Sequence, residues 1–450
     1  MSRVVALIDG EHYPPVVRFA LEQLAREHEV VAAAFLGGTE KIDLERGLDT
    51  YGVPLVTGPT PAATLATALA HWAPELVIDL SDEPVLSSAQ RFELASVALA
   101  HGVAYRGADF GFEPQRSLAE PATPVLAIVG TGKRVGKTAL SADIARRLKA
   151  GGRDVVVLAM GRGGPAEPEL IRGDEVALTT ADLLALARQG KHASSDNYED
   201  AVMSRVTTVG CRRCGGGMAG ATFFSNVREG AALADSLGKE LLIAEGSGAA
   251  IPPVAFDAAV LVVGAGRGET YVRDYFGPYR LAQADLVVIA GAEEPVATAE
   301  EVASIRAIIA AQRPDLPVIA TTFRPRPIES VAGKRVFFAT TAPSEVVPSL
   351  AAHLAAEHGC HVVGASAHLS DRMRLGADMD ACLGGYDVLL TELKAAAIDV
   401  VAIAGEEAGV PTVLCDNVPV AVDGSDLGAQ IARVAQLAIE RGCARNEASQ

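Results

Sequence analysis

Cysteine, aromatic residues and long apolar runs are all scarce in this chain of 450 residues. Six cysteines in so long a sequence do not form the dense framework of a disulfide-stabilised secreted domain. No apolar run approaches the ~18 residues of a membrane span, and residues 1–10 read as one short strand rather than a signal segment. We therefore expect a cytoplasmic protein with no membrane partner.

Positive charge is also in deficit, with 39 Lys and Arg against 56 Asp and Glu and a formal net charge of −17. Such a surface repels phosphates at long range, which argues against a nucleic acid as the main partner. Any phosphate site must then be a local cluster of basic side chains. Aromatic residues make up only 5% of the chain, and its many small aliphatic side chains suit helices packed closely on a parallel sheet.

The most informative stretch is 124–146, PVLAIVGTGKRVGKTALSADIAR, an apolar run followed by a glycine-rich turn and a helical pattern. The turn reads Gly130, Thr131, Gly132, Lys133, Arg134, Val135, Gly136, Lys137, Thr138. A strand, a glycine turn and a helix N-terminus direct backbone N–H groups at one spot, which is how proteins hold a polyphosphate. Lys137 would reach the phosphates and the Thr138 hydroxyl would ligate Mg²⁺, so we predict a site for ATP with Mg²⁺. An ordinary glycine-rich turn is the alternative.

The first glycine of this loop lies one residue earlier than the standard spacing, which would require glycine where Thr131 stands. Five residues therefore separate Gly130 from Gly136. This longer loop resembles that of dethiobiotin synthetase and its relatives, which phosphorylate small acids and include partition-type ATPases.

The chain before this loop alternates strands and helices. Strands are expected at 4–8, 30–35 and 76–80, and helices at 16–26, 62–72 and 90–101. The alternation predicts an α/β fold with a small, doubly wound N-terminal domain over residues 1–120. A proline-rich linker at 113–124 then leads into a P-loop ATPase core with a mostly parallel sheet over 121–450, with a C-terminal α/β extension from about residue 345 as the alternative division.

Strands continue through the second domain without a second linker. They are expected at 154–160, 241–244, 259–263, 286–290, 318–321, 335–339, 361–364, 387–390, 399–403 and 411–415. Open parallel sheets bind ligands at the carboxyl ends of their strands, so the residues that follow each strand are the candidates for a site.

Acidic residues follow several of these strands. Asp9, Glu11 and His12 come after the first strand, and for His12 a loop hydrogen bond is the alternative to a catalytic role. Glu245 ends an apolar strand and fits the role of the acid that holds Mg²⁺. Asp182 opens a helix and is either its capping carboxylate or a metal ligand.

Basic residues gather on the turns of the second domain. They are Lys133, Arg134, Arg162, Arg212, Arg213, Arg267 and Arg324. A nucleotide alone needs fewer cations, so their concentration in a net acidic protein predicts a second, highly anionic substrate. A surface arginine on a turn is the alternative for Arg162.

Cys211 and Cys214 form the one closely spaced pair of cysteines in the sequence. A single pair cannot close a structural zinc site, which needs four ligands. A redox pair is a further alternative, but the flanking Arg212 and Arg213 and three following glycines favour an anion cradle. The polar stretch 191–213 reads as a substrate loop, with a solvated connector as the alternative.

The sequence resembles the cyclic 2,3-diphosphoglycerate synthetase family over nearly its whole length. The resemblance rests on LIDGEHYPPV at 7–16, the loop at 130–138, MGRGGP at 160–165 and GAGRGE at 264–269. It implies an ATP-dependent ligase that closes the two phosphates of 2,3-bisphosphoglycerate into an internal anhydride and releases ADP and phosphate.

The resemblance also implies roles for the candidate residues. Those acting on the transferring phosphoryl group would be Lys137, Lys133 and Arg162, and those holding Mg²⁺ would be Thr138, Asp182 and Glu245. The bisphosphate would contact Asp9, Glu11, His12, Arg162, Arg212, Arg213, Arg267 and Arg324. We expect a homodimer, because large α/β ligases of this kind are often symmetric.

Two rival functions stay open. A dethiobiotin-type ligase would share the loop, but it would lack the N-terminal domain and would not need so many arginines. A P-loop regulatory or metal-delivery ATPase would bind a transition metal at Cys211 and Cys214.

Overall fold

The computed structural model describes residues 1–38, 40 and 50–448, which form two compact units. The first unit takes Met1–Arg116 together with Glu269–Gln283 and Ala311–Arg313, and the second takes the remainder. The expected α/β class and the mostly parallel sheet are confirmed. The amino-acid composition of the two later segments, 269–283 and 311–313, gives no indication that they belong to the first unit.

The first unit is built on a six-stranded sheet with the strand order β3-β2-β1-β4-β5-β6. Every neighbouring pair is parallel except β5 with β6. The strands are β1 (Arg3–Ile8), β2 (Glu29–Phe35), β3 (Leu55–Val56), β4 (Leu76–Asp79), β5 (Ala104–Arg106) and β6 (Gly111–Phe112). The helices are α1 (Pro14–Leu24), α2 (Pro61–Trp72), α3 (Ser88–Ala100), α8 (Thr270–Arg273) and α9 (Gly277–Gln283).

The second unit is built on one large sheet that contains two blocks of parallel strands. The core block has the order β10 (Thr207–Cys214), β8 (Val155–Gly161), β12 (Leu241–Glu245), β7 (Val125–Gly130), β13 (Ala258–Gly264), β14 (Leu286–Ala290), β15 (Val318–Pro327). Two short strands, β9 (Glu169–Arg172) and β11 (Phe224–Ser225), pair antiparallel with β10. The C-terminal block has the order β19 (Thr412–Ala421), β18 (Val388–Glu392), β16 (Arg335–Ala339), β17 (His361–Ser366).

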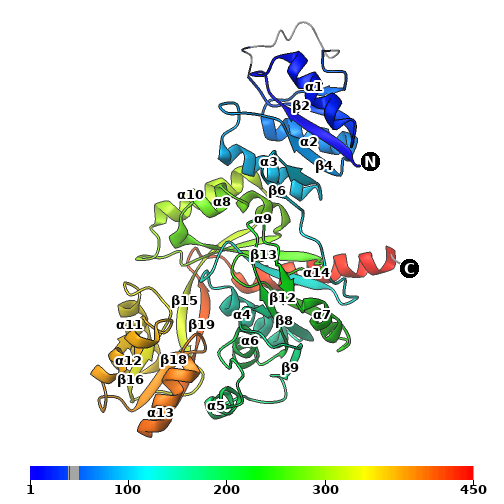
Figure 1. Cartoon of the computed structure of the whole chain (residues 1–450). Coiled ribbons are helices and arrows are strands. Elements are labelled where there is room, and N and C mark those ends of the chain that lie inside the picture. The colour runs from blue at the N-terminus through cyan, green and yellow to red at the C-terminus, as the bar shows by residue number, and fades with distance from the viewer. Residues whose placement is uncertain (39, 41–49, 449–450) are drawn as a thin grey trace. The chain divides into compact units, whose positions relative to one another are not determined.

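An antiparallel ribbon of β15 and β19 joins the two blocks (Figure 1). Residues 318–321 of β15 pair with β14, and residues 321–327 pair with 415–421 of β19. Residues 412–415 of β19 pair with β18. β15 thus extends beyond the carboxyl end of the core block, and β19 extends beyond the carboxyl end of the C-terminal block. Because these two extensions pair antiparallel, the carboxyl ends of the two blocks face each other across the ribbon.

Helices cover both faces of the core block. α4 (Lys137–Ala150) and α14 (Leu427–Ala448) bury Leu140, Ile144 and Val434 against Leu126 and Ile128 of β7. α7 (Val227–Asp235) packs with the residues of the opposite face. The other helices are α5 (Thr180–Arg188), α6 (Asp196–Ser204), η3 (Ala265–Arg267), α10 (Ala299–Gln312), α11 (Val347–His358), α12 (Arg372–Ala381), η4 (Ala397–Ala402) and α13 (Ile403–Ala408). Among the described residues, none of the helices has the length and apolar character that a bilayer crossing requires.

Two expectations from the sequence are wrong in this unit. Residues 399–403, predicted as a strand, belong to the π-helix η4 and to α13. A short buried apolar run has no period that separates a strand from a helix. The stretch 191–213, interpreted as a loop, contains α6 and β10, and the polar side chains of α6 are largely buried against α4.

A buried carboxylate fastens the ribbon to the core block. Asp416 on β19 is 3% exposed and accepts hydrogen bonds from Arg146 Nη1 of α4 at 2.9 Å and from Arg326 Nη2 of β15 at 2.8 Å. Hydrogen bonds to charged groups contribute more to stability than neutral ones, roughly 1.5–3 kcal/mol each. One carboxylate therefore ties both ribbon strands to the helix that follows the glycine-rich loop.

Replacing Asp416 with Asn should lower the free energy of unfolding by about 2 kcal/mol, because both guanidinium groups lose their shared carboxylate. Denaturant unfolding measures this difference. Asp154→Asn is the matched control, because Asp154 is 64% exposed and pairs with Lys239 at the surface. The control should change the free energy of unfolding by less than ~1 kcal/mol. Equal stability of Asp416→Asn and the wild type would contradict the role of this clamp.

Candidate active site

The segment 130–138 forms the turn between β7 and α4 at the carboxyl end of the core block. Gly136 has a φ of 87°, a conformation that favours glycine. A Cβ at Gly130 would come within 2.6 Å of Lys137 Cδ, so the lysine side chain lies directly across that glycine. The strand, turn and helix expected for a phosphate-binding loop are therefore present.

Lys137 is buried in this turn, with an exposed fraction of 6%. Burial lowers the pKa of its ammonium, while the charges of Glu245 and Asp196 oppose that shift. The neighbouring Thr138 Oγ1 donates a 2.8 Å hydrogen bond to Glu245 Oε1 at the end of β12. The structure thus brings the strand-end acid to the hydroxyl of the loop.

Glu245 lies beside a second buried carboxylate, Asp200 of α6. Both oxygens of Asp200 and Oε2 of Glu245 are buried without a donor group among the described residues. A hydrogen bond between the two carboxyl groups would require a shared proton. Burial and the neighbouring charge of Glu245 raise the pKa of Asp200 well above its ordinary value. Burial and the charge of Asp196 raise the pKa of Glu245 to about 7.

This pair of acids fits a magnesium ion. Mg²⁺ prefers oxygen ligands and is usually held by one or two carboxylates together with phosphate oxygens. Unsatisfied oxygens of Asp200 and Glu245 beside the Thr138 hydroxyl supply such a set. In the described part of the chain no group of three or more His, Cys, Asp and Glu side chains could hold a metal ion. A metal at this position would therefore depend on the phosphates of a nucleotide for further ligands.

Asp196 opens α6 next to the same two acids. A Cβ at Gly161, the last residue of β8, would lie 3.1 Å from Asp196 Oδ2, so this carboxylate sits at the end of that strand. Its charge affects the pKa values of Lys133, Lys137 and Glu245. Asp196 therefore interacts electrostatically both with the two lysines of the loop and with the buried Glu245.

Cations also converge on the loop. The charge of Arg162 is the largest cause that lowers the pKa of Lys133, followed by burial and the charge of Arg134. The pKa of Arg213 is lowered by burial first and then by Arg162. Arg267 Nη2 donates a hydrogen bond to the Lys133 carbonyl at 3.3 Å. Like charges held this close together favour the binding of an anion.

Two other predicted residues are engaged in local pairs. Asp182 accepts hydrogen bonds from the backbone N and the Oγ1 of Thr179 at 2.8 and 2.6 Å, which makes it part of the capping box of α5. No hydrogen bond or ion pair joins Asp182 to the loop in the described part of the chain. Arg324 of β15 forms an ion pair with Glu293 at 2.7 Å.

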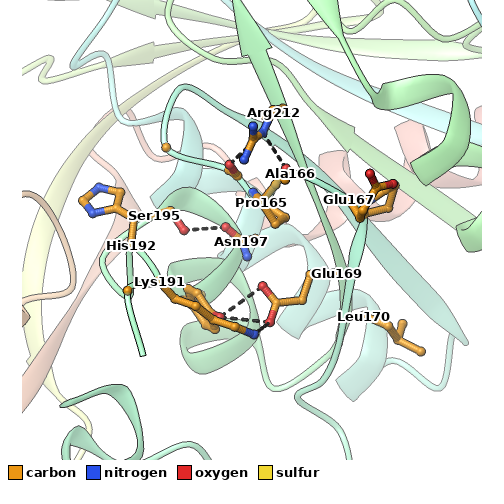
Figure 2. A pocket seen from close by; sticks show the side chains of 15 residues that line it. Pro165, Ala166, Glu167, Glu169, Leu170, Lys191, His192, Ser195, Asn197 and Arg212 are labelled. Carbon is orange, nitrogen blue, oxygen red and sulfur yellow. Dashed lines mark hydrogen bonds and ion pairs between the residues drawn. The ribbon is translucent and has the colours of Figure 1, made fainter. Parts of the chain in front are cut away.

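Arg212 lines a cavity of about 700 Å³ beside α6, with walls from within 163–170 and 190–198. Figure 2 shows its guanidinium turned toward the loop wall, where Nε donates to the carbonyl of Pro165 at 2.7 Å. Lys191 pairs with Glu169, and the Tyr198 hydroxyl donates to the same carboxylate at 3.0 Å. These polar groups are therefore already engaged with one another or with the backbone of the cavity wall.

The cysteine pair does not converge on one site. Cys211 and Cys214 lie three residues apart on β10, so their side chains point to opposite faces of the strand. Cys211 is buried against α7, where a Cβ at Gly230 would come within 2.1 Å of its Sγ, whereas Cys214 is exposed. This geometry is unsuited to a shared metal ion or a redox pair.

The predicted residues of the first unit form a cluster of their own. Asp9 is fully buried and accepts hydrogen bonds from the backbone N of Glu11, His12 and Asp82 at 3.0, 3.2 and 2.8 Å. His12 Nδ1 lies 2.8 Å from Asp9 Oδ1. Burial would raise the pKa of Asp9, but these hydrogen bonds outweigh it and lower the pKa. The carboxylate of Asp9 therefore organises the turn after β1.

Sequence reasoning assigned no individual role to Asp196, Glu199, Asp200 or Lys394. The three acids belong to the polar stretch 191–213, which reads as a substrate loop or a solvated connector, and only the density of acids within 194–201 points to these residues. Lys394 follows β18, and its Nζ lies 2.9 Å from Glu199 Oε1. Burial would lower the pKa of Lys394, but the charge of Glu199 outweighs it and the pKa lies above its ordinary value. Applying the strand-end rule to β18 would have found this lysine.

Family models described as cyclic 2,3-diphosphoglycerate synthetase match the chain in three parts. The N-terminal domain model matches residues 3–113, the P-loop domain model residues 125–322 and the C-terminal domain model residues 327–418. The last two ranges correspond closely to the core block and the C-terminal block.

Several relatives carry the name cyclic 2,3-diphosphoglycerate synthetase. One from Methanothermus fervidus is 45% identical over 450 residues and covers 98% of each chain. One from Rubrobacter xylanophilus is 48% identical, covering 96% of this chain and 98% of the relative. One from Thermococcus kodakarensis is 47% identical, covering 94% and 96%. Among solved structures, LpxK from Aquifex aeolicus in complex with ATP covers 71% of this chain and 90% of that chain at 14% identity, with a TM-score of 0.41.

Replacing Asp200 with Asn keeps the shape of the side chain and removes a buried carboxyl group whose ionisation is disfavoured beside Glu245. Without divalent cations and at neutral pH we expect the melting temperature to rise by about 2 °C or more, because folding no longer has to protonate and bury a carboxyl group that is ionised in the unfolded chain. We also expect Mg²⁺ with ADP to stabilise the variant far less than the wild type, because one metal ligand is lost. Thermal unfolding with EDTA and with Mg²⁺ plus ADP measures both effects.

The exposed Asp315 provides the control, and Asp315→Asn should show neither effect. An Asp200→Asn variant that keeps the full stabilisation by Mg²⁺ and ADP would show that this carboxylate is not a metal ligand.

Proposed function

The chain belongs to the cyclic 2,3-diphosphoglycerate synthetase family, and we propose that it joins the two phosphates of 2,3-bisphosphoglycerate in an internal anhydride at the expense of ATP. The observation that supports this best is the contact of Thr138 with Glu245 beside the buried Lys137. That arrangement suits a nucleotide with its metal ion, and the cations around it suit a second anionic substrate.

The nucleotide would occupy the loop 130–138. Backbone N–H groups and Lys137 would bind its phosphates, and Thr138, Glu245 and Asp200 would hold Mg²⁺. We propose Asp200 in the place that the sequence suggested for Asp182, because its two buried oxygens lack donors. When bound, Mg²⁺ neutralises charge on the phosphates of the nucleotide.

The reaction consists of two substitutions at phosphorus. An oxygen of one substrate phosphate attacks the γ-phosphorus of ATP, and ADP leaves with the oxygen that bridged the β- and γ-phosphorus atoms. The neighbouring substrate phosphate then attacks the phosphorus of the activated group. Inorganic phosphate leaves with the oxygen that made the first attack. One anhydride bond is broken in ATP and one is formed in the product, so no water is consumed.

Catalysis would depend on positioning and on charge. Lys133, Lys137 and Arg162 would stabilise the negative charge on the transferring phosphoryl group. Arg213 and Arg267 would bind the substrate, since both lie close to the cations of the loop. Arg212 and Arg324 are weaker candidates for this role, because in the described part of the chain no hydrogen bond or ion pair joins either side chain to the loop 130–138.

A metal-delivery ATPase is the less favoured function, because the side chains of Cys211 and Cys214 point away from each other. A dethiobiotin-type ligase is also less favoured, since it would not need the first unit. We further propose a cytoplasmic homodimer, for which the symmetry common among large enzymes is the support. Light scattering of the purified protein tests the oligomeric state.

Incubation with ATP, Mg²⁺ and 2,3-bisphosphoglycerate should produce ³¹P resonances of a cyclic anhydride together with ADP and phosphate. Lys137→Ala should reduce this rate by roughly 10²-fold or more while the fold survives, because the lysine acts on developing charge. Lys149→Ala, which changes an exposed lysine of the same helix, should leave the rate unchanged.

The outcome that contradicts the proposal is ATP hydrolysis that is indifferent to the bisphosphate and yields no cyclic product. Full activity of Lys137→Ala would exclude the loop as the catalytic site.

A further inference from the structure

The carboxyl ends of the strands in the C-terminal block form a second polar surface. Glu392 ends β18, and its carboxylate accepts hydrogen bonds from the hydroxyl of Thr340 and, at 2.7 Å, from that of Thr341, both at the end of β16. Lys394 follows two residues later. Because the ribbon makes the two blocks face each other, this surface is directed toward the phosphate loop.

Two contacts connect this surface with the loop region. Lys394 Nζ lies 2.9 Å from Glu199 Oε1 of α6, and Arg134 Nη2 of the loop donates a 2.9 Å hydrogen bond to Ser370 Oγ after β17. A hydrogen bond from Ala396 N to the carbonyl of Leu369 at 3.2 Å holds the turns after β18 and β17 together. A cation from each block therefore reaches the space between the blocks.

The backbone around Lys394 is unusual. Ala395 has a φ of 47°, which is uncommon for a residue with a Cβ, and the π-helix η4 begins two residues later. Strained residues and π-helical turns persist where the surrounding structure holds them, and both are frequent at functional sites. The turn therefore holds Lys394 in a defined position.

A contribution to stability alone does not explain why a lysine occupies position 394. A buried ion pair often contributes no more to stability than well-packed apolar side chains. The Glu199 side chain is 7% exposed, whereas that of Lys394 is 26% exposed. The lysine side chain thus keeps an exposed part beside a buried acid.

We propose that Lys394 is a substrate-binding residue that holds the attacking phosphate of the bisphosphate, assisted by Arg134 from the loop. This inference rests on the proposed function. The phosphate that is activated must lie next to the γ-phosphate at Lys133 and Arg162, so its neighbour on the adjacent carbon lies farther from the nucleotide. The surface on the side away from the nucleotide belongs to the C-terminal block. Lys394 is a basic residue of this block and contacts Glu199 of α6.

Binding measurements on Lys394→Gln test the proposal. Titration calorimetry in the presence of Mg²⁺ and ADP should show bisphosphate binding about tenfold or more weaker than in the wild type, because a charge-assisted contact is lost. The affinity for ADP should stay within about twofold, since the loop is unchanged. Lys394→Arg should recover part of the bisphosphate affinity.

Lys334→Gln is the matched control. Lys334 is an exposed lysine of the same block that precedes β16, at the opposite end of the strands, so its loss should change neither affinity. Weakened ADP binding with normal bisphosphate binding in Lys394→Gln would overturn the proposal, because the lysine would then serve the nucleotide. Unchanged binding of both ligands, with only a lower melting temperature, would overturn it in favour of a structural role.

A second measurement on the wild type covers the case in which Lys394→Gln does not fold. Lysine acylation followed by mass spectrometry should show Lys394 protected by the bisphosphate in the presence of Mg²⁺ and ADP, but not by Mg²⁺ and ADP alone. Equal labelling with and without bisphosphate would refute the inference. A wild type that forms cyclic product while failing this test refutes the inference alone, whereas a wild type that forms none refutes the proposed function.

Discussion

The antiparallel pairing of β15 with β19 is the constraint on which the site depends. Each strand extends beyond the carboxyl end of its own parallel block before it pairs with the other. Ligand sites of parallel sheets form at carboxyl ends, so this pairing makes two such surfaces face each other. Asp416 holds the ribbon to α4, which carries Lys137 and Thr138 at its start. The position of the C-terminal block is thereby coupled to the phosphate loop.

The charges gathered between the blocks explain how a strongly acidic protein can hold two phosphorylated ligands. The acids Glu245 and Asp196 lie beside Lys137, with the buried Asp200 next to Glu245. The cations Lys133 and Arg162 lie together. Acids suited to a metal ion and cations suited to phosphates thus occupy one place. Charges fixed before the ligands arrive need little reorganisation during the reaction, which is the main source of electrostatic catalysis.

Local features of the site could be predicted from the sequence, whereas features that depend on tertiary packing could not. The phosphate loop could be predicted because its strand, turn and helix are contiguous in the sequence. Glu245 could be predicted because it ends a recognisable apolar strand. Asp200 and Lys394 reach the site only because α6 packs on α4 and the ribbon turns the C-terminal block around. At position 182 the sequence could not decide between two roles, because aspartate is common both in helix caps and among metal ligands. The hydrogen bonds of Asp182 with Thr179 show that it belongs to the cap. Periodicity likewise could not separate a strand from the buried π-helix at 397–402.

The central claim is that the γ-phosphoryl group passes directly to the substrate in the space between the two blocks. Bisphosphate labelled with ¹⁸O in its phosphate groups tests this most directly, with the released inorganic phosphate analysed by mass spectrometry. Direct transfer predicts that each released phosphate carries one oxygen from the substrate. Released phosphate that instead carries an oxygen from water would contradict the account, because ATP would then have been hydrolysed without activating the bisphosphate.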